Sequence, residues 1–151
     1  MAIRNVLKNN EPPLREVCRE VTAFDERLWS LLNDLRDTML FEDGVGLAAP
    51  QVGVLKRVAV LKSLDGVEYF ELINPVIEKT EGEQIVSEGC LSIPNAHGKV
   101  KRPSEIIVSY FDREGVRRQV EVKDFFAVIF CHEIDHLDGI LYTDRMVAAA
   151  D

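Results

Sequence analysis

One stretch of the sequence decides how the rest is interpreted: His132-Glu133-Ile134-Asp135-His136, an H-E-x-x-H pattern. Residues four apart lie one turn apart on the same face of a helix, so the two imidazoles can converge on one metal ion. Glu133 lies between them, within reach of water at the metal without being a ligand. The alternative is a chance pair of solvent-exposed histidines. The apolar flanks, Ala127–Phe130 and Leu137, instead indicate a buried helix, where two unused histidines would be costly.

A catalytic metal site of this kind needs a third protein ligand and leaves one position open. Only fifteen residues follow His136, and they include neither histidine nor glutamate. The ligand is therefore expected upstream. Cys90 is the best candidate, because a thiolate is a strong ligand for a borderline-soft metal and Gly89 allows close backbone approach. The alternative for Cys90 is a small buried apolar side chain.

Hydrophobic periodicity predicts a helix at each end of a strand-rich middle. A helix is expected over about 25–42, capped by Asp25 and ended by Gly44, and a second runs from an Asp124 cap to about Leu137. The apolar stripe of the first helix is interpreted as core and consists of Leu28, Leu31, Leu32, Leu35, Met39 and Leu40.

Strands are expected between the two helices. Arg57–Leu61 is expected to pair with Tyr69–Ile73, and Asn74-Pro75 ends the second of these strands. Val76–Val86 is expected to form a strand, a turn at Glu81-Gly82 and a returning strand. Ile106–Tyr110 is expected to pair with Val116–Val122. Residues 1–24 are expected to be irregular, with Pro12-Pro13 breaking any helix. The fold class is α+β, with antiparallel or mixed sheets around a central H-E-x-x-H helix and an N-terminal helix.

Length and composition narrow the classes of protein. The 151 residues suit a single domain over 1–151, and a formal net charge of −8 argues against a specific nucleic-acid partner. Three cysteines do not make a disulfide framework, and the sequence has neither a signal peptide nor an apolar run long enough to span a membrane. We therefore expect a cytoplasmic protein with no membrane partner.

Three segments together resemble the peptide deformylase family. They are Gly44-Val45-Gly46-Leu47-Ala48-Ala49-Pro50-Gln51, Glu88-Gly89-Cys90-Leu91-Ser92 and His132-Glu133-Ile134-Asp135-His136-Leu137. Their order and spacing match the family, and a looser similarity extends from about Leu14 to Met146. Each segment alone is moderate evidence, whereas the three in order are strong evidence.

The resemblance implies an enzyme that hydrolyses the N-formyl group from the initiator methionine of new polypeptides and releases formate. Cys90, His132 and His136 would bind one divalent metal and Glu133 would move the protons. The Gln51 side chain and the Leu91 backbone N–H would stabilise the oxyanion. Iron, as Fe²⁺, is the expected native metal, and Zn²⁺, Ni²⁺ and Co²⁺ suit the same ligands.

The resemblance also implies how substrate is held. The backbone at Gly46 would pair with the extended peptide like an added strand. A methionine pocket would be lined by Val45, Val86, Phe125, Val128 and Ile129, although apolar residues beside a buried helix are also ordinary core. His97 stands where many members have arginine near the peptide, with simple exposure as the alternative. The alternative for Gln51 is an ordinary loop glutamine whose side chain is solvated.

Two further residues near the H-E-x-x-H pattern have structural expectations. Asp135 is expected to pair with Arg102 and fix the ligand helix, or to form a plain surface ion pair. Cys131 stands where members often carry glutamine, and is interpreted as a packing residue.

Partners and rival functions follow from the same residues. N-formylmethionyl peptides and nascent chains are the expected partners, and a ribosome contact is left open. The compartment is the bacterial cytoplasm, with an organellar origin left open. Rival functions are a zinc peptidase, which lacks a downstream ligand here, and a structural or purely binding protein, which would not need Glu133.

Overall fold

The structure, a computed structural model, describes residues 2–149. Its elements in chain order are η1 (Pro12–Arg15), α1 (Glu26–Phe41), β1 (Gly46–Ala48), η2 (Ala49–Val52), β2 (Val58–Lys62), β3 (Tyr69–Glu81), β4 (Gln84–Cys90), β5 (Ile93–Arg102), β6 (Glu105–Phe111), β7 (Arg117–Lys123), α2 (Asp124–Leu137), η3 (Tyr142–Asp144) and β8 (Met146–Ala149). The predicted α+β class is confirmed, and every pairing between named strands is antiparallel.

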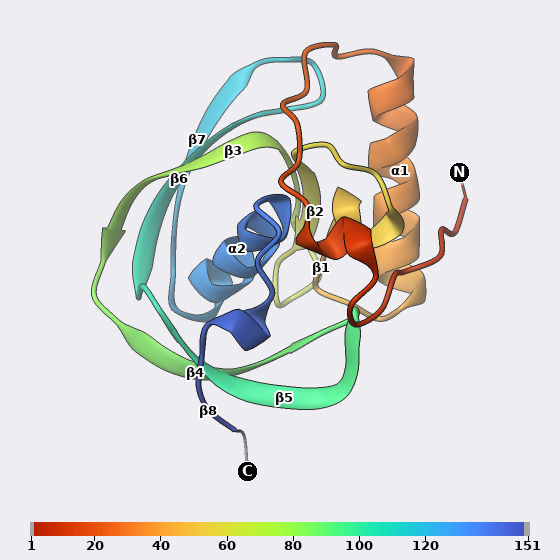
Figure 1. Cartoon of the computed structure of the whole chain (residues 1–151). Helices are drawn as coiled ribbons and strands as arrows, with labels where there is room; N and C mark the ends of the chain where they lie inside the picture. Colours follow the sequence, from red (N-terminus) through yellow and green to blue (C-terminus); the bar gives the residue numbers. More distant parts are fainter. Residues whose placement is uncertain (1, 150–151) are drawn as a thin grey trace.

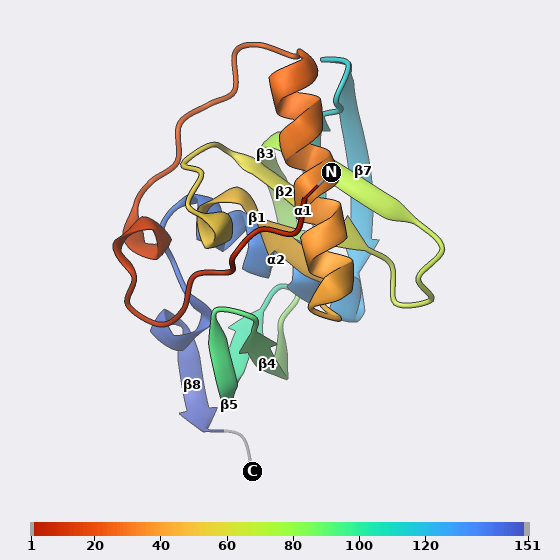
Figure 2. The ribbon, with the colours of Figure 1, turned by 90° about the vertical axis from the view of Figure 1, so that its right-hand side faces the viewer.

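Two sheets surround α2 (Figure 1). The larger has the order β1-β2-β3-β6-β7, and the smaller has the order β4-β5-β8. Figure 2 shows α1 against the larger sheet, with the smaller sheet below α2 in this view. The larger sheet therefore has a helix on each side, and α2 faces both sheets.

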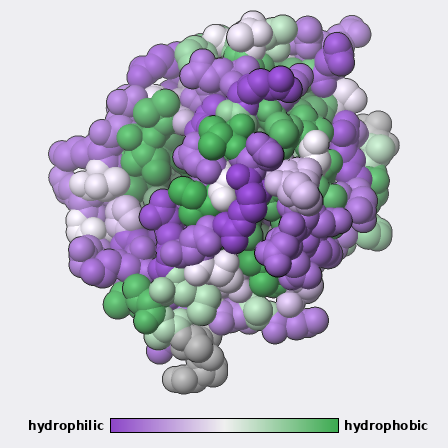
Figure 3. Space-filling model, in the orientation of Figure 1, coloured by the Kyte–Doolittle hydropathy of each residue, from purple (hydrophilic) through white to green (hydrophobic). Residues whose placement is uncertain are grey.

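The two faces of the larger sheet bury separate cores, as alternation along a strand requires. On the α2 side, Phe130 packs with Leu61, Leu72 and Val108, while on the α1 side Leu32, Leu35 and Met39 pack with Val58, Val60 and Ile73. On the face of the molecule that Figure 3 shows, hydrophilic side chains surround small separate groups of hydrophobic ones. This is an ordinary protein surface.

Helix α1 confirms the first helical prediction within a residue at each end. The Asp25 carboxylate accepts a hydrogen bond from the Leu28 N–H at 3.2 Å, as an N-cap should. The apolar stripe is buried except for Leu40, which is 42% exposed. Leu40 therefore lies outside the core that its spacing suggested.

Strand β3 corrects the expectation that Asn74-Pro75 ends a strand, because it continues to Glu81. The pair forms a bulge, marked by the register shift between Ile73 and Val76. Asn74 adopts φ +50°, which asparagine tolerates, and its side chain bonds the backbone of Val21 in both directions, at 2.8 and 2.9 Å. A bulge also accommodates a proline, which has no N–H to donate.

Two other local expectations were wrong. After Gly82 the chain does not return along β3 but enters β4 in the other sheet, a choice of partner that turn residues do not encode. At α2, Lys123 is the N-cap, and no side chain caps the helix; Asp124 is its first residue, at φ +56°. The hairpin of β6 and β7 is confirmed, with Asp112–Gly115 at its turn.

Candidate metal centre

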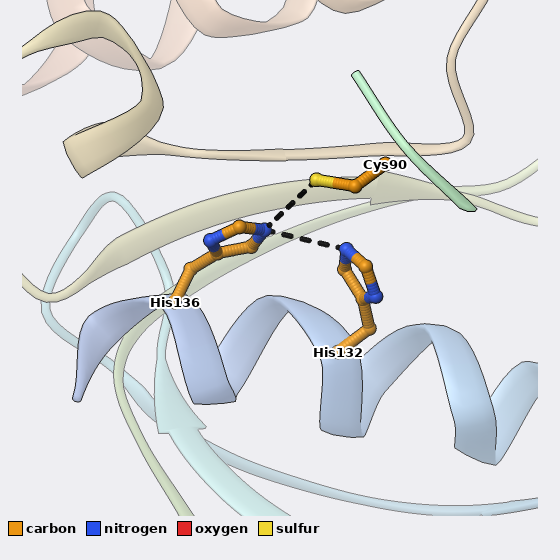
Figure 4. A group of neighbouring side chains, drawn as sticks. All are labelled: Cys90, His132 and His136. Atoms are coloured by element: carbon orange, nitrogen blue, oxygen red, sulfur yellow. Dashed lines mark hydrogen bonds between the residues drawn. The ribbon is translucent and has the colours of Figure 1, made fainter. Parts of the chain in front are cut away.

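Helix α2 presents its two histidines side by side. His132 and His136 are one turn apart, their ring centroids are 5.0 Å apart, and their Nε2 atoms are 3.3 Å apart. Both rings are buried because the helix is apolar over most of its length. Figure 4 shows both rings rising from the same face of the helix.

The smaller sheet brings the cysteine to this pair. Cys90 is the last residue of β4, next to a register shift at Glu88, and its Sγ lies 3.4 Å from Nε2 of His136. One ligand atom from each of Cys90, His132 and His136 lies within 4.8 Å of the others. A sulfur and two ring nitrogens from distant parts of the chain therefore face one point.

The charges around this point suit a bound cation. Burial opposes charge on His132, but contacts with Cys90 and Glu88 outweigh it and raise the pKa of His132 well above its usual value. Burial and the neighbouring charges of His132 and Arg102 lower the pKa of His136. The surroundings thus favour positive charge at His132 and keep His136 neutral, with a lone pair to donate. A divalent metal bound by the ring nitrogens can provide this positive charge in place of a proton.

Glu88 orients His132 from behind. Its Oε1 lies 2.8 Å from Nδ1 of His132, so this ring nitrogen is the donor and Nε2 is left to bind. Arg102 donates to both oxygens of Glu88 at 2.7 and 2.9 Å. Burial would raise the pKa of Glu88, but Arg102 and His132 outweigh it and hold that pKa below its usual value.

Arg102 also donates to Asp135 at 2.7 Å, which confirms the predicted pair as a buried one. The part of Glu88 in this network was missed in the sequence, although its place two residues before Cys90 was the available signal.

Glu133 is buried beside the histidines. It is 4% exposed, and its Oε1 has no hydrogen-bond partner among residues 2–149. Burial raises its pKa to about 7. A carboxyl group with such a pKa can accept or donate a proton near neutral pH.

Gln51 is 1% exposed, so it is not a solvated loop glutamine. Its Oε1 accepts the Ala48 N–H at 2.9 Å, and its Nε2 donates to Ser92 Oγ at 3.1 Å and contacts Cys90 Sγ at 3.6 Å. The two bonds, one to Ala48 at the end of β1 and one to Ser92 just after β4, point the amide N–H group toward the metal centre. Ser92 was not singled out in the sequence, although it belongs to the same segment as Cys90.

A cavity of about 340 Å³ opens beside these groups. The residues expected in the site that line it are Val45, Gly46, Gln51, Cys90, Leu91, His97, Phe125, Val128, Ile129, His132 and Glu133. Val86 does not line it. That residue lies further back along β4, opposite Val100 of β5, and its side chain is half-buried.

Cys131 and His97, the two residues that depart from the family pattern, lie in different environments. Cys131 is 4% exposed within the core, and burial raises its pKa to about 11, so it is a packing thiol. His97 is exposed at the mouth of the cavity. A Cβ at Gly89 would lie 2.8 Å from its ring, so the imidazole covers this glycine.

Comparisons with known proteins show which family the chain is similar to. The family model described as polypeptide deformylase matches residues 3–150. Peptide deformylase of Acetivibrio thermocellus is 52% identical, covering all of this chain and 88% of the relative; that of Thermoanaerobacter pseudethanolicus is 47% identical, covering all of this chain and 94% of the relative.

Solved structures agree as well. Peptide deformylase from Legionella pneumophila superposes with a TM-score of 0.93 at 39% identity, over 96% of this chain and 86% of that one. Peptide deformylase from Thermotoga maritima superposes with a TM-score of 0.93 at 35% identity, over 97% of this chain and 99% of that one. In residues 2–149, no helix is long and apolar enough to cross a membrane.

Proposed function

The chain belongs to the polypeptide deformylase family, hydrolases that remove the N-formyl group from newly made polypeptides, and from this premise we propose which residues perform the reaction. Cys90, His132 and His136 bind one divalent metal ion, and Glu133 moves the protons. The observation that carries the proposal is the convergence of the three ligand atoms within 4.8 Å beside a buried carboxyl group.

The donor set fits a metal and leaves room for water and substrate. Three ligands from two elements are typical of a catalytic site, whereas a structural site uses four. When bound, the metal supplies a Lewis acid that polarises the formyl oxygen and lowers the pKa of the attacking water. The 340 Å³ cavity beside the three ligand atoms provides the approach for both reactants.

Glu133 takes a proton from water as the water attacks the formyl carbon, and later gives it to the departing amine. A pKa of about 7 suits both steps, because the same group must accept and then release a proton. The formyl C–N bond breaks, formate leaves, and the peptide keeps a free amino group. Glu133 lines the cavity, and its Oε1 has no hydrogen-bond partner among residues 2–149. That oxygen is therefore free for this proton exchange.

Gln51 and the Leu91 backbone N–H stabilise the negative charge that develops on the formyl oxygen. The Gln51 amide is already aimed by Ala48 and Ser92, so it needs no reorganisation during the reaction. The backbone at Gly46 aligns the peptide as an added strand, since β1 is the edge strand of the larger sheet and β2 is its one partner strand among residues 2–149.

The methionine side chain occupies the apolar end of the cavity, formed by Val45, Phe125, Val128 and Ile129. His97, at the mouth, contacts the residues that follow the methionine. One catalytic domain over 1–151 performs the reaction on nascent chains, at or near the ribosome, in the cytoplasm of a bacterium. Fe²⁺ is the proposed native metal, because a thiolate with two imidazoles binds it well, as it does Zn²⁺, Ni²⁺ and Co²⁺.

The test is formate release from formyl-Met-Ala-Ser by the native protein and by Glu133→Ala, both reconstituted with Fe²⁺ or Ni²⁺ without oxygen. We expect turnover by the native protein. The variant should keep its metal and lose ~10²–10⁴-fold in rate, the usual contribution of a general acid–base group.

Cys131→Ala is a matched control, since this neighbour of the ligands takes no part in the proposal. Equal rates for native protein and Glu133→Ala would remove Glu133 from the mechanism. Formate release by neither would favour a protein that only binds nascent chains.

A further inference from the structure

Residues 141–145 fold back against the metal centre, although none of the three family segments includes them. We name them the return segment. They contain η3 and lead into β8, which pairs with β5 through Lys99–Ala148 and Val100–Met146 (Figure 1). The pairing holds the return segment near Arg102, the last residue of β5.

Arg145 of this segment binds the helix that carries the histidines. Its Nε donates to Oδ2 of Asp135 at 2.7 Å and its Nη2 to Oδ1 at 3.1 Å, a two-point contact with both carboxylate oxygens. Oδ2 of Asp135 also accepts the Arg102 bond at 2.7 Å. Asp135 is therefore fixed between two guanidinium groups.

A continuous chain of charged hydrogen bonds then leads from the surface to the metal centre. It runs from Arg145 to Asp135, Arg102, Glu88 and Nδ1 of His132, with each link at 3.1 Å or less. Side-chain exposure falls from 45% at Arg145 to 12% at Asp135 and 3% at Arg102. The chain thus begins in solvent and ends on a buried ligand.

Arg145 supplies one of the two guanidinium groups in this chain. Two guanidinium groups face two carboxylates, Asp135 and Glu88. Without Arg145, Arg102 alone must satisfy both carboxylates, and it can turn away from Glu88 toward Asp135. Glu88 would then hold the His132 ring less firmly.

Tyr142 fixes the same ring from another direction. It is 2% exposed, and its ring stacks on His132 at 6.2 Å between centroids and 22° between planes. The return segment therefore contacts the ligand apparatus at two points, through Tyr142 directly and through Arg145 by way of Asp135.

We propose that Arg145 is a positioning residue for the metal ligand His132, acting through Asp135, Arg102 and Glu88, with Tyr142 packing the same ring. The proposal rests on the proposed metal-binding role of His132. It adds a requirement that the three family segments do not contain.

The experiment compares the native protein with Arg145→Met, which keeps most of the aliphatic stem and removes the charge. Both are loaded with Co²⁺, and the rate of metal loss to a chelator, the visible Co²⁺ absorption spectrum, and kcat and KM for formyl-Met-Ala-Ser are measured. We expect metal loss ~10-fold faster or more, as for other groups that orient ligands, with an altered spectrum. We also expect a lower kcat and little change in KM.

Arg118→Met is the matched control. Arg118 is 58% exposed and pairs with Asp112 at 3.0 Å, and among residues 2–149 it forms no hydrogen bond with Arg145, Asp135, Arg102, Glu88 or His132. This variant should match the native protein in all four measurements. Arg145→Lys, which keeps the charge without the two-point contact, should fall between native protein and Arg145→Met.

Combining Arg145→Met with Glu88→Gln tests the route. If Arg145 acts through Glu88, the double variant loses metal no faster than Glu88→Gln alone, because the effects of residues in one network do not add. Additive effects would refute this route. If Arg145→Met does not fold, Arg145→Lys carries the test, and an unchanged rate of metal loss in it would overturn the proposal.

The outcomes separate this proposal from the proposed function. A native protein that binds no Co²⁺ would refute both. The native protein could bind Co²⁺ and release formate while Arg145→Met showed the same spectrum and the same rate of metal loss. That result would refute only the positioning role. A lower melting temperature without those changes would likewise show a merely structural pair.

Discussion

Replacing Gly46 with alanine should disable the proton carrier without touching a metal ligand. A Cβ at this position would lie 2.6 Å from Oε2 of Glu133 and 2.9 Å from its Cδ and Cγ. Gly46 cannot yield easily, because β1 pairs with Leu61 of β2 at this residue. The Glu133 side chain must therefore move.

The size of that movement sets the expected loss. The contact at 2.6 Å falls about 0.8 Å short of the 3.4 Å at which ordinary contact begins. A misplacement of about 1 Å in a catalytic group costs ~10²-fold in rate, which corresponds to ~2.7 kcal/mol in the activation barrier. Metal content should stay at the native level, because the three atoms nearest to the new methyl group all belong to Glu133 and none to Cys90, His132 or His136.

The assay is steady-state formate release from formyl-Met-Ala-Ser at matched metal content, with a crystal structure of the variant. Gly44→Ala is the comparison, since its Cβ would meet only the flexible end of the Leu91 side chain, at 2.8 Å, and we expect a smaller loss. If Gly46→Ala kept the native kcat while its crystal structure showed Glu133 displaced, the placement of this carboxyl group would not govern the rate. An undisplaced Glu133 would refute the steric reasoning itself.

Three other predictions concern the metal centre and the fold. Gln51→Ala should lower kcat ~10²–10³-fold at native metal content, because one donor to the developing oxyanion is lost, and kinetics of formate release with an unchanged kcat would contradict this. Asp34 has a pKa below its usual value, because its bonds from the Ala2 N–H and Arg4 at 2.8 and 2.9 Å outweigh its burial; its stabilisation is present above the unfolded pKa of about 3.9 and is lost as pH falls through the lower folded value. Asp34→Asn should therefore cost about 1–2 kcal/mol in urea unfolding at pH 7 and less as the pH falls below about 3.9, whereas an equal cost throughout would refute the ionic explanation. Removing the metal with a chelator should lower the melting temperature, since a ligand at 100 times its Kd stabilises by ~2.7 kcal/mol, and calorimetry showing no shift would argue against a site formed only in the folded chain.

Local patterns predicted those elements whose residues interact with near neighbours. The stripe from Leu28 to Met39 gave α1, and the alternation around Asp112–Gly115 gave the hairpin of β6 and β7. Both signals depend on contacts within a few residues of the chain. Leu40 was assigned to the core wrongly, because spacing alone does not say where a helix leaves its sheet.

Long-range pairing was beyond the same patterns. Asn74-Pro75 looked like the end of a strand, but Arg57 and Val21 hold it as a bulge inside β3. The turn at Gly82 was located correctly, yet its second strand joined another sheet. Strands β1, β5 and β8 were not predicted, because short or polar segments become strands through the partners that they meet.

The sequence by itself identified the candidate metal ligands and the candidate proton carrier, because H-E-x-x-H on an apolar helix and a cysteine beside a glycine are residue types and spacings that suit this chemistry. Only the tertiary structure decided that Cys90 reaches the histidines, that Val86 lies outside the cavity, that Glu88 bonds His132, and that Arg145 bonds Asp135. These depend on how two sheets close around α2. The physical reason is that spacing along a chain fixes which side chains share a helix face, whereas burial and ion pairing between distant segments fix what stands opposite that face.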